Sequence, residues 1–151
     1  MKKQEYVDVL SGVWLFSGCT KKELTALAAL ATQVDVPAGK VLATQGQPGR
    51  EFFVVVSGKA EATRGNVPIG VLGPGTFFGE MSLLENKPRV ATVTTTEPTS
   101  VLVLTAQEFD SVVEMMPTVD RKILVVLAER LRDVEERYVP ADARLVSKDI
   151  A

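Results

Sequence analysis

Eight short β-rich runs between residues 34 and 105 limit the folds open to this chain more than any other feature. The runs lie at 34–37, 40–45, 51–58, 59–64, 68–73, 76–78, 89–96 and 100–105. Turn-forming glycines and prolines separate them, for example at Gly58 and at 73–75. Short, regularly spaced strands with such turns are typical of a sandwich, a jelly roll or a small barrel.

Helical patterns flank the strands on both sides. Thr20 and Glu23 have the spacing of a capping box, and the apolar residues after them recur at helical intervals. We therefore expect an N-terminal helix that begins near Lys21 and ends before residue 34. A second capping box, Thr105 and Glu108, predicts another helix that continues to the proline at 117.

A longer helix is predicted over residues 119–139, with a proline at 140 marking its end. Its apolar stripe comprises Ile123, Leu127, Val134 and Tyr138, with Val126 and Leu131 beside it. The order is thus helix, about eight strands, helix and long helix. We expect one domain over 1–151, with a mainly β core at about 34–105 and C-terminal helices at about 106–138.

Charge and composition exclude several functional classes. The 17 basic and 19 acidic residues give a net charge of −2, and no segment is strongly basic, which disfavours nucleic-acid binding. The chain contains no histidine, which removes histidine-based acid/base catalysis, Ser-His or Cys-His nucleophiles and histidine metal sites. We therefore expect no catalytic residues, no metal and no enzymatic activity.

The remaining sequence features suggest a cytoplasmic protein without a membrane anchor. The first ten residues lack the apolar region of a signal peptide, and the longest aliphatic stretch, 123–128, is far too short to span a bilayer. The single cysteine, Cys19, cannot form an intrachain disulfide. Because it lies near a predicted helix N-terminus and Lys21, its pKa could be lowered, but a single cysteine is more often a small buried or partly buried apolar group.

One segment, 77–93, interrupts the strand pattern and carries the candidate chemistry. It is predicted to contain a short helical turn whose first residue, Gly79, allows a ligand close to the main chain. Arg89 could bind an anion through charge-assisted hydrogen bonds, and Glu80 could accept hydrogen bonds from hydroxyl groups. The pair fits a phosphate beside a sugar hydroxyl, but a salt bridge across a loop is the structural alternative.

Residues 78–93 read FGEMSLLENKPRVATV. This segment closely resembles the phosphate-binding cassette of cyclic nucleotide-binding domains, the family of catabolite-activator-type regulators and protein kinase A regulatory subunits. Residues 51–63, EFFVVVSGKAEAT, and 69–80, IGVLGPGTFFGE, are similar to the family's strands before the cassette. The resemblance covers roughly 13–138. It implies an eight-stranded β-roll, a jelly-roll-like double-stranded β-helix, with an N-terminal helix, a short cassette helix and two C-terminal helices.

The resemblance also implies roles for individual residues. Arg89 would bind the cyclic phosphate and Glu80 the ribose 2′-hydroxyl. The whole implied nucleotide site comprises Gly79, Glu80, Met81, Ser82, Arg89, Val90 and Ala91. In this family a hydroxyl just after the arginine tends to bind guanine; here Val90 and Ala91 lack one, and Thr92 carries the nearest. We therefore expect cyclic AMP rather than cyclic GMP as the ligand, and no further cofactor.

The residues that would contact the base are less sharply defined. In relatives the last helix often closes over the pocket, and strand residues also meet the base. The candidates are Arg130, Leu131, Val134 and Tyr138 of the long helix and Ile69 and Val71 of a strand. The alternative is that Leu131 and Val134 belong to the core face of an amphipathic helix and that Arg130 is solvated.

These observations predict a stand-alone cyclic-nucleotide sensor that signals through its C-terminal helices to a separate effector protein. The long helix is also the expected surface for a homodimer, since relatives often dimerise through it. The alternative is a protein interaction domain whose cassette binds no nucleotide. A DNA-binding regulator needs a helix-turn-helix, for which residues 140–151 are too few, and a metal-dependent cupin enzyme needs clustered histidines.

Overall fold

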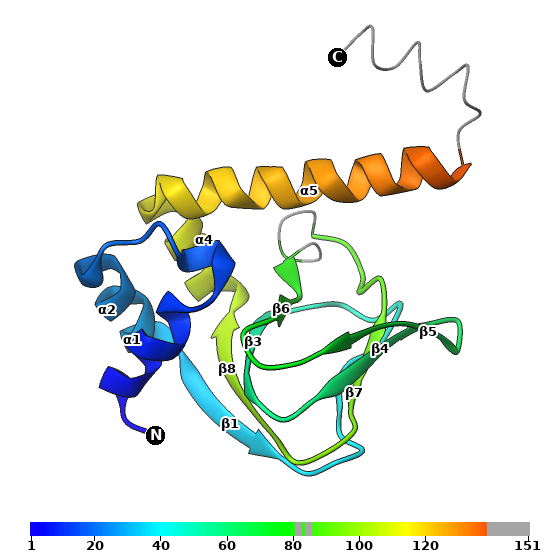
Figure 1. Cartoon of the computed structure of the whole chain (residues 1–151), viewed down its shortest axis with the longest axis horizontal. Coiled ribbons are helices and arrows are strands. Elements are labelled where there is room, and N and C mark those ends of the chain that lie inside the picture. Colours follow the sequence, from blue (N-terminus) through cyan, green and yellow to red (C-terminus); the bar gives the residue numbers. More distant parts are fainter. Residues whose placement is uncertain (81–82, 84–85, 139–151) are drawn as a thin grey trace, which may run out of the picture.

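The computed structural model describes residues 1–80, 83 and 86–138, and the side chains of these residues except those of 130 and 133–138. The helices are α1 (Lys3–Ser11), the 3₁₀ helix η1 (Trp14–Phe16), α2 (Lys21–Leu30), α4 (Ala106–Met115) and α5 (Pro117–Tyr138) (Figure 1). The strands are β1 (Thr32–Val36), β2 (Val41–Ala43), β3 (Glu51–Ser57), β4 (Ala60–Arg64), β5 (Val67–Leu72), β6 (Phe77–Phe78), β7 (Thr92–Thr95) and β8 (Thr99–Thr105).

The strands form two antiparallel four-stranded sheets, which confirms the predicted eight-stranded β-roll. One sheet has the order β1-β8-β3-β6 and the other β2-β7-β4-β5. Val34 pairs with Val101 in the first sheet, and Ala62 pairs with Val93 in the second. Strands distant in sequence are thus neighbours, and the chain passes repeatedly between the sheets. Helices α1, α2 and α4 gather beside β1 and β8 in Figure 1.

Strand β3 is apolar along nearly its whole length because both of its faces are covered. Phe52 and Val54 belong to a core cluster shared with the helices, whereas Phe53 and Val55 belong to a second cluster formed by residues of both sheets. Successive side chains of a strand point to opposite faces, so burial on both faces produces a continuous apolar run. This strand therefore joins the two cores.

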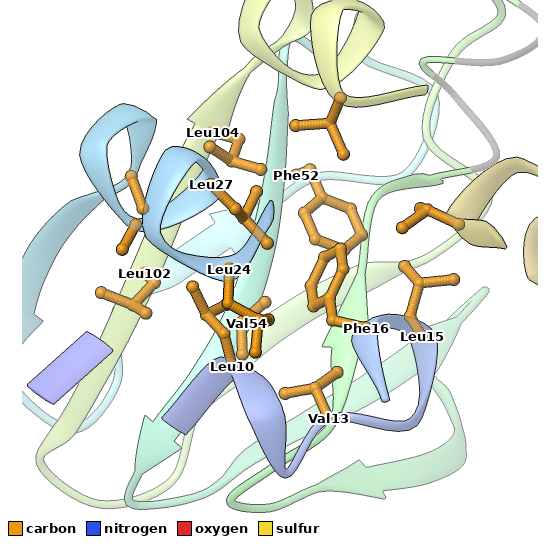
Figure 2. Close-up of a cluster of buried hydrophobic side chains, with 14 of the residues drawn as sticks. Leu10, Val13, Leu15, Phe16, Leu24, Leu27, Phe52, Val54, Leu102 and Leu104 are labelled. Carbon is orange, nitrogen blue, oxygen red and sulfur yellow. The ribbon is translucent and has the colours of Figure 1, made fainter. Parts of the chain in front are cut away.

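Aromatic side chains hold the helices against β3. The ring of Phe52 stacks on that of Phe109 in α4 at 4.8 Å between centroids and meets Phe16 of η1 edge-on at 6.3 Å. Figure 2 shows Phe16 and Phe52 together, with leucines of α2 beside them. Pairs of this kind contribute about 0.5–1.5 kcal/mol beyond their buried area. The helical cluster is therefore fixed to the sheet that leads into the candidate site.

The predicted helix starts are confirmed. Both capping boxes are formed, with the hydroxyls of Thr20 and Thr105 accepting from the main-chain N–H three residues later. Pro117 begins α5, where a proline costs nothing because the first N–H of a helix has no partner within it. On α5, Ile123 of the predicted stripe is buried, but Leu131, predicted beside the stripe, is exposed. Among the described residues, no helix is both long and apolar enough to cross a membrane.

Three sequence-based expectations need correction. Helix α1 was not predicted; it is mostly polar and buries only Tyr6 and Leu10. The strand expected over 89–96 is shorter, because the main chain of Arg89 bonds to the loop between β2 and β3 instead of continuing the ladder. Finally, half-burial and the nearby Glu23 raise the pKa of the Cys19 thiol, against a smaller lowering by Lys122 of α5, so the lowered pKa is wrong and the partly buried apolar cysteine is the correct alternative.

Candidate functional site

The segment between β6 and β7 leaves the first sheet directly beside β3. Phe78 pairs with Phe53, so the next residue, Gly79, lies against the main chain of β3. Gly79 has a φ of +100°, and a Cβ atom there would lie 2.6 Å from the carbonyl oxygen of Glu51. A side chain at this position would be strained and would collide, so glycine is what permits the close approach. The backbone of Glu80 is helical.

Arg89 returns to the same place from the other end of the segment. Its Nη2 atom donates to the carbonyl oxygen of Glu51 at 2.6 Å, and its Nη1 atom donates to that of Gly79 at 3.2 Å. The residue is only 7% exposed, and the guanidinium carbon lies 5.9 Å from the centroid of the Phe53 ring. Two carbonyls do not exhaust the N–H donors of a guanidinium, so donors remain for an anion.

The main chain of Arg89 is held by the loop between β2 and β3. The Arg89 N–H donates to the carbonyl oxygen of Gln47 at 2.8 Å, and the Gly46 N–H donates to the carbonyl oxygen of Arg89 at 2.9 Å. An isolated antiparallel bridge between Pro48 and Pro88 continues this contact. From the sequence alone, the glycines and proline of 46–49 indicate only a turn. Its contribution to the site is made by backbone groups, which leave no chemical signature in the sequence.

Glu80 lies in the same buried region as Arg89. It is 2% exposed, although carboxylates are rarely buried to this extent unless they are paired. Burial lowers the pKa of Arg89, and the charges of Glu51 and then Glu80 oppose this effect. The structure therefore brings the two predicted side chains close enough to interact electrostatically.

The other cassette residues differ in their surroundings. Val90 is exposed, and its carbonyl oxygen accepts a hydrogen bond from Nε of Arg64 at 3.1 Å. Ala91 is half-buried and leads into β7. The hydroxyl oxygen of Thr92, the nearest hydroxyl to Arg89 in the sequence, accepts from the main-chain N–H of Gln45 at 3.0 Å. Met81 and Ser82 lie outside the described residues.

The candidates for a base contact are surface side chains where the structure describes them. Ile69 and Val71 lie on β5, an edge strand of the second sheet, and Val71 is 68% exposed. Leu131 on α5 is 62% exposed, so its interpretation as a core residue is wrong. The side chains of Arg130, Val134 and Tyr138 lie outside the described ones. Apolar groups on both β5 and α5 are thus open to contact.

A cavity of about 230 Å³ has Arg89 in its wall. Its lining residues are Val41, Leu42, Ala43, Thr44, Gln47, Pro48, Arg50, Glu51 and Arg89. The lining itself carries two arginines and one carboxylate, which favours an anion in the cavity. Arg50 is not among the predicted site residues, although it directly precedes Glu51, the first residue of β3.

Comparison with known proteins gives one consistent result. Residues 33–115 match the profile of the family described as the cyclic nucleotide-binding domain. The chain is 30% identical over 131 residues to the cyclic AMP receptor protein of Thermus thermophilus, a match that covers 83% of this chain and 61% of the relative. This chain therefore spans less than two thirds of that relative.

Solved structures agree with the sequence match. The structure of cAMP-bound PfPKA-R has a TM-score of 0.79 and 29% identity, covering 90% of this chain and 47% of that one. The structure of Sp-2Cl-cAMPS bound to PKAR CBD2 has a TM-score of 0.78 and 27% identity, covering 90% of both chains. The fold, the cassette sequence and the family match lead to one conclusion: this chain belongs to the cyclic nucleotide-binding domain family.

Proposed function

We propose that this chain binds a cyclic nucleotide at Glu80 and Arg89 and acts as a non-catalytic regulatory module. The observation that carries the proposal is the buried Arg89 guanidinium, held by two main-chain carbonyls beside the buried Glu80. A cyclic phosphate is an anion for the remaining donors of Arg89, and the ribose 2′-hydroxyl is a donor for the carboxylate of Glu80. Two similar solved structures, one with cAMP and one with Sp-2Cl-cAMPS, support this choice of ligand.

The remaining residues of the proposed site shape the pocket and contact the base. Gly79, Met81, Ser82, Val90 and Ala91 would line the phosphate and ribose. The base would lie against exposed apolar groups, for which Ile69 and Val71 on β5 and Leu131 on α5 are suitable by their exposure. Arg130, Val134 and Tyr138 remain candidates from the same helix.

We propose cyclic AMP rather than cyclic GMP as the ligand. Val90 and Ala91 carry no hydroxyl that could bind guanine. The hydroxyl of Thr92 is already engaged with the main chain of Gln45. An additional polar group on the base would therefore be desolvated without a partner from these residues, which costs free energy.

Calorimetric titration with cyclic AMP, cyclic GMP and linear AMP tests the proposal. We expect saturable binding, tightest for cyclic AMP, which Arg89→Ala weakens roughly 10- to 150-fold, the range for losing a charged hydrogen bond. Arg121→Ala, which removes the same charge from an exposed position on α5, serves as the matched control. If folded, nucleotide-free protein binds no cyclic nucleotide, the chain is an interaction domain with a silent cassette.

We further propose that the signal passes through the C-terminal helices to a separate effector protein. Leu83 of the cassette packs against the cluster that contains Phe109 of α4 and Ile123 of α5. A change at the cassette could therefore alter helix packing, provided that the ligand binds the two arrangements unequally. Hydrogen exchange in α5 should change on adding cyclic AMP, and Leu83→Ala should reduce that change while binding persists.

The exposed side of α5 supports a contact with a second copy of the chain. Leu124 and Leu131 are 61% and 62% exposed and lie seven residues apart, on one face of the helix. Sedimentation should show a dimer that dissociates in the double variant Leu124→Glu with Leu131→Glu, while circular dichroism shows that the variant is still folded. A wild-type monomer at all concentrations would contradict the dimer and leave this face for the effector.

A further inference from the structure

The guanidinium of Arg89 occupies the space that a side chain at position 49 would need. A Cβ atom added to Gly49 would lie 2.4 Å from Nε of Arg89, 2.6 Å from Cζ and 2.8 Å from Cδ. Distances this short are far inside van der Waals contact. Even the smallest side chain at this position is therefore incompatible with the present place of the guanidinium.

The backbone at Gly49 does not itself require glycine. Gly46 and Gly79, on either side of the site, have φ angles of +84° and +100°, whereas Gly49 is not among the residues with positive φ. Its neighbours Arg50 and Pro48 continue in ordinary backbone geometry. What glycine supplies at this position is space and not conformational freedom.

The atoms that a methyl group would displace belong to a flexible side chain, which makes the consequence specific. Nε, Cζ and Cδ of Arg89 can move without unfolding the main chain around them. The guanidinium would then leave the carbonyl oxygens of Glu51 and Gly79, although the loop remains bonded to the main chain of Arg89. A substitution at Gly49 should thus move the functional group and preserve the fold.

We infer that Gly49 is a positioning residue of the nucleotide site: its missing side chain lets Arg89 settle on two main-chain carbonyls. This inference rests on the proposed function for its effect on affinity, but not for its effect on Arg89. Gly49 touches the arginine and acts through it. Preorganising a charged donor in this way avoids an ordering cost when the anion binds.

The first test compares Gly49→Ala with Gly73→Ala. An added Cβ at Gly73 meets nothing within 4 Å, and its φ is also not positive, so this variant is a matched control. We expect Gly49→Ala to unfold within a few degrees of the wild type and to bind cyclic AMP roughly tenfold or more weakly, the scale for disturbing a charged hydrogen bond. Gly73→Ala should bind like the wild type, and equal affinities of all three proteins would overturn the inference.

A double-mutant cycle separates positioning from a general effect on the pocket. Once Arg89→Ala has removed the guanidinium, the methyl group of Ala at position 49 has nothing to displace. Gly49→Ala should therefore cause no further loss of affinity in the Arg89→Ala background. Losses that add in the double variant would mean that Gly49 acts independently of Arg89 and would refute the inference.

A ligand-free measurement keeps the two proposals distinguishable. The Nε–Hε resonance of Arg89, identified by its absence in Arg89→Ala, reports the surroundings of the guanidinium directly. It should shift in Gly49→Ala and stay in place in Gly73→Ala, with no nucleotide present. If the wild type binds no cyclic nucleotide, the proposed function fails, but this resonance still tests the role of Gly49. A resonance that does not shift in Gly49→Ala would refute the inference that Gly49 positions Arg89.

Discussion

Lys122 of α5 holds Trp14 of η1 by two contacts at once. Its Nζ atom donates to the carbonyl oxygen of Trp14 at 2.8 Å and lies 5.0 Å from the centroid of the Trp14 ring. Nζ also hydrogen-bonds the hydroxyl of Ser17. Next to it, Gly18 leaves room for Thr118, since a Cβ there would lie 2.5 Å from the methyl carbon of that residue. The start of α5 is thus anchored to the segment before the roll.

Lys122→Ala should loosen this anchor. A hydrogen bond is worth about 0.5–1.5 kcal/mol and an exposed cation–π contact about 0.5–1 kcal/mol, so we expect a loss of about 1–2.5 kcal/mol in the free energy of unfolding. Urea denaturation measures the loss, with Arg121→Ala, one position earlier and exposed, as the control. A variant as stable as this control would show that the contacts contribute nothing.

Glu80→Gln should show whether Glu80 binds the ribose 2′-hydroxyl of the nucleotide. If the carboxylate accepts a hydrogen bond from the 2′-hydroxyl, the substitution should weaken the binding of cyclic AMP about tenfold, because a hydrogen bond to a charged group is lost. Binding of 2′-deoxy cyclic AMP, which lacks that hydroxyl, should change little. Calorimetry with both ligands measures the two affinities. An equal loss of affinity for both would mean that Glu80 supports the structure of the pocket and does not recognise the ribose.

Val90→Thr should shift the choice between the two nucleotides. Val90 is exposed, so replacing a methyl group by a hydroxyl of similar shape should leave the stability almost unchanged. A new neutral hydrogen bond to guanine is worth about 0.5–1.5 kcal/mol, or roughly 2- to 12-fold in the cyclic GMP to cyclic AMP affinity ratio. Competition binding measures this ratio, and a ratio that stays constant would argue against a guanine contact here.

Cys19 should react slowly in the folded protein. Burial raises the pKa of its thiol, and the charge of Glu23 raises it further, so the folded state keeps the proton to higher pH than the unfolded chain. Because the thiolate is the reactive form, alkylation by iodoacetamide near pH 8 should be slower in folded than in urea-unfolded protein. The contribution of Cys19 to stability is present at neutral pH and is lost as the pH rises through the folded pKa. Equal alkylation rates would contradict the raised pKa.

Much of the fold is predictable from the sequence because its signals are local. The two capping boxes and the turn glycines act within a few residues; Gly58, for example, has a φ of +87° and lies at the turn from β3 of one sheet to β4 of the other. Helix α1 escaped prediction because it is held by tertiary packing of Tyr6 and Leu10, not by a strong pattern of its own.

The site, like the fold, has residues that the sequence predicts and residues that it does not. Glu80 and Arg89 could be found because both belong to one short motif and both carry charge. The carbonyl oxygen of Glu51 and the empty space at Gly49 could not, because they come from the start of β3 and the loop before it and act without any side-chain chemistry. Arg89 and Glu51 are 38 positions apart, and the pairing of β3 with β6 and the bonds of Arg89 to the loop between β2 and β3 bring them together.

The central place of β8 in its sheet has a consequence for how the chain is made. Thr32 pairs with Val103, so β1 can pair only after β8, which lies 71 positions later (103 minus 32), is available. Closing so long a loop is slow compared with forming helices. During synthesis on the ribosome, β1 and β3 therefore stay without their shared neighbour until β8 has emerged. A chain cut before β8 would expose both strand edges to other copies and should aggregate instead of folding.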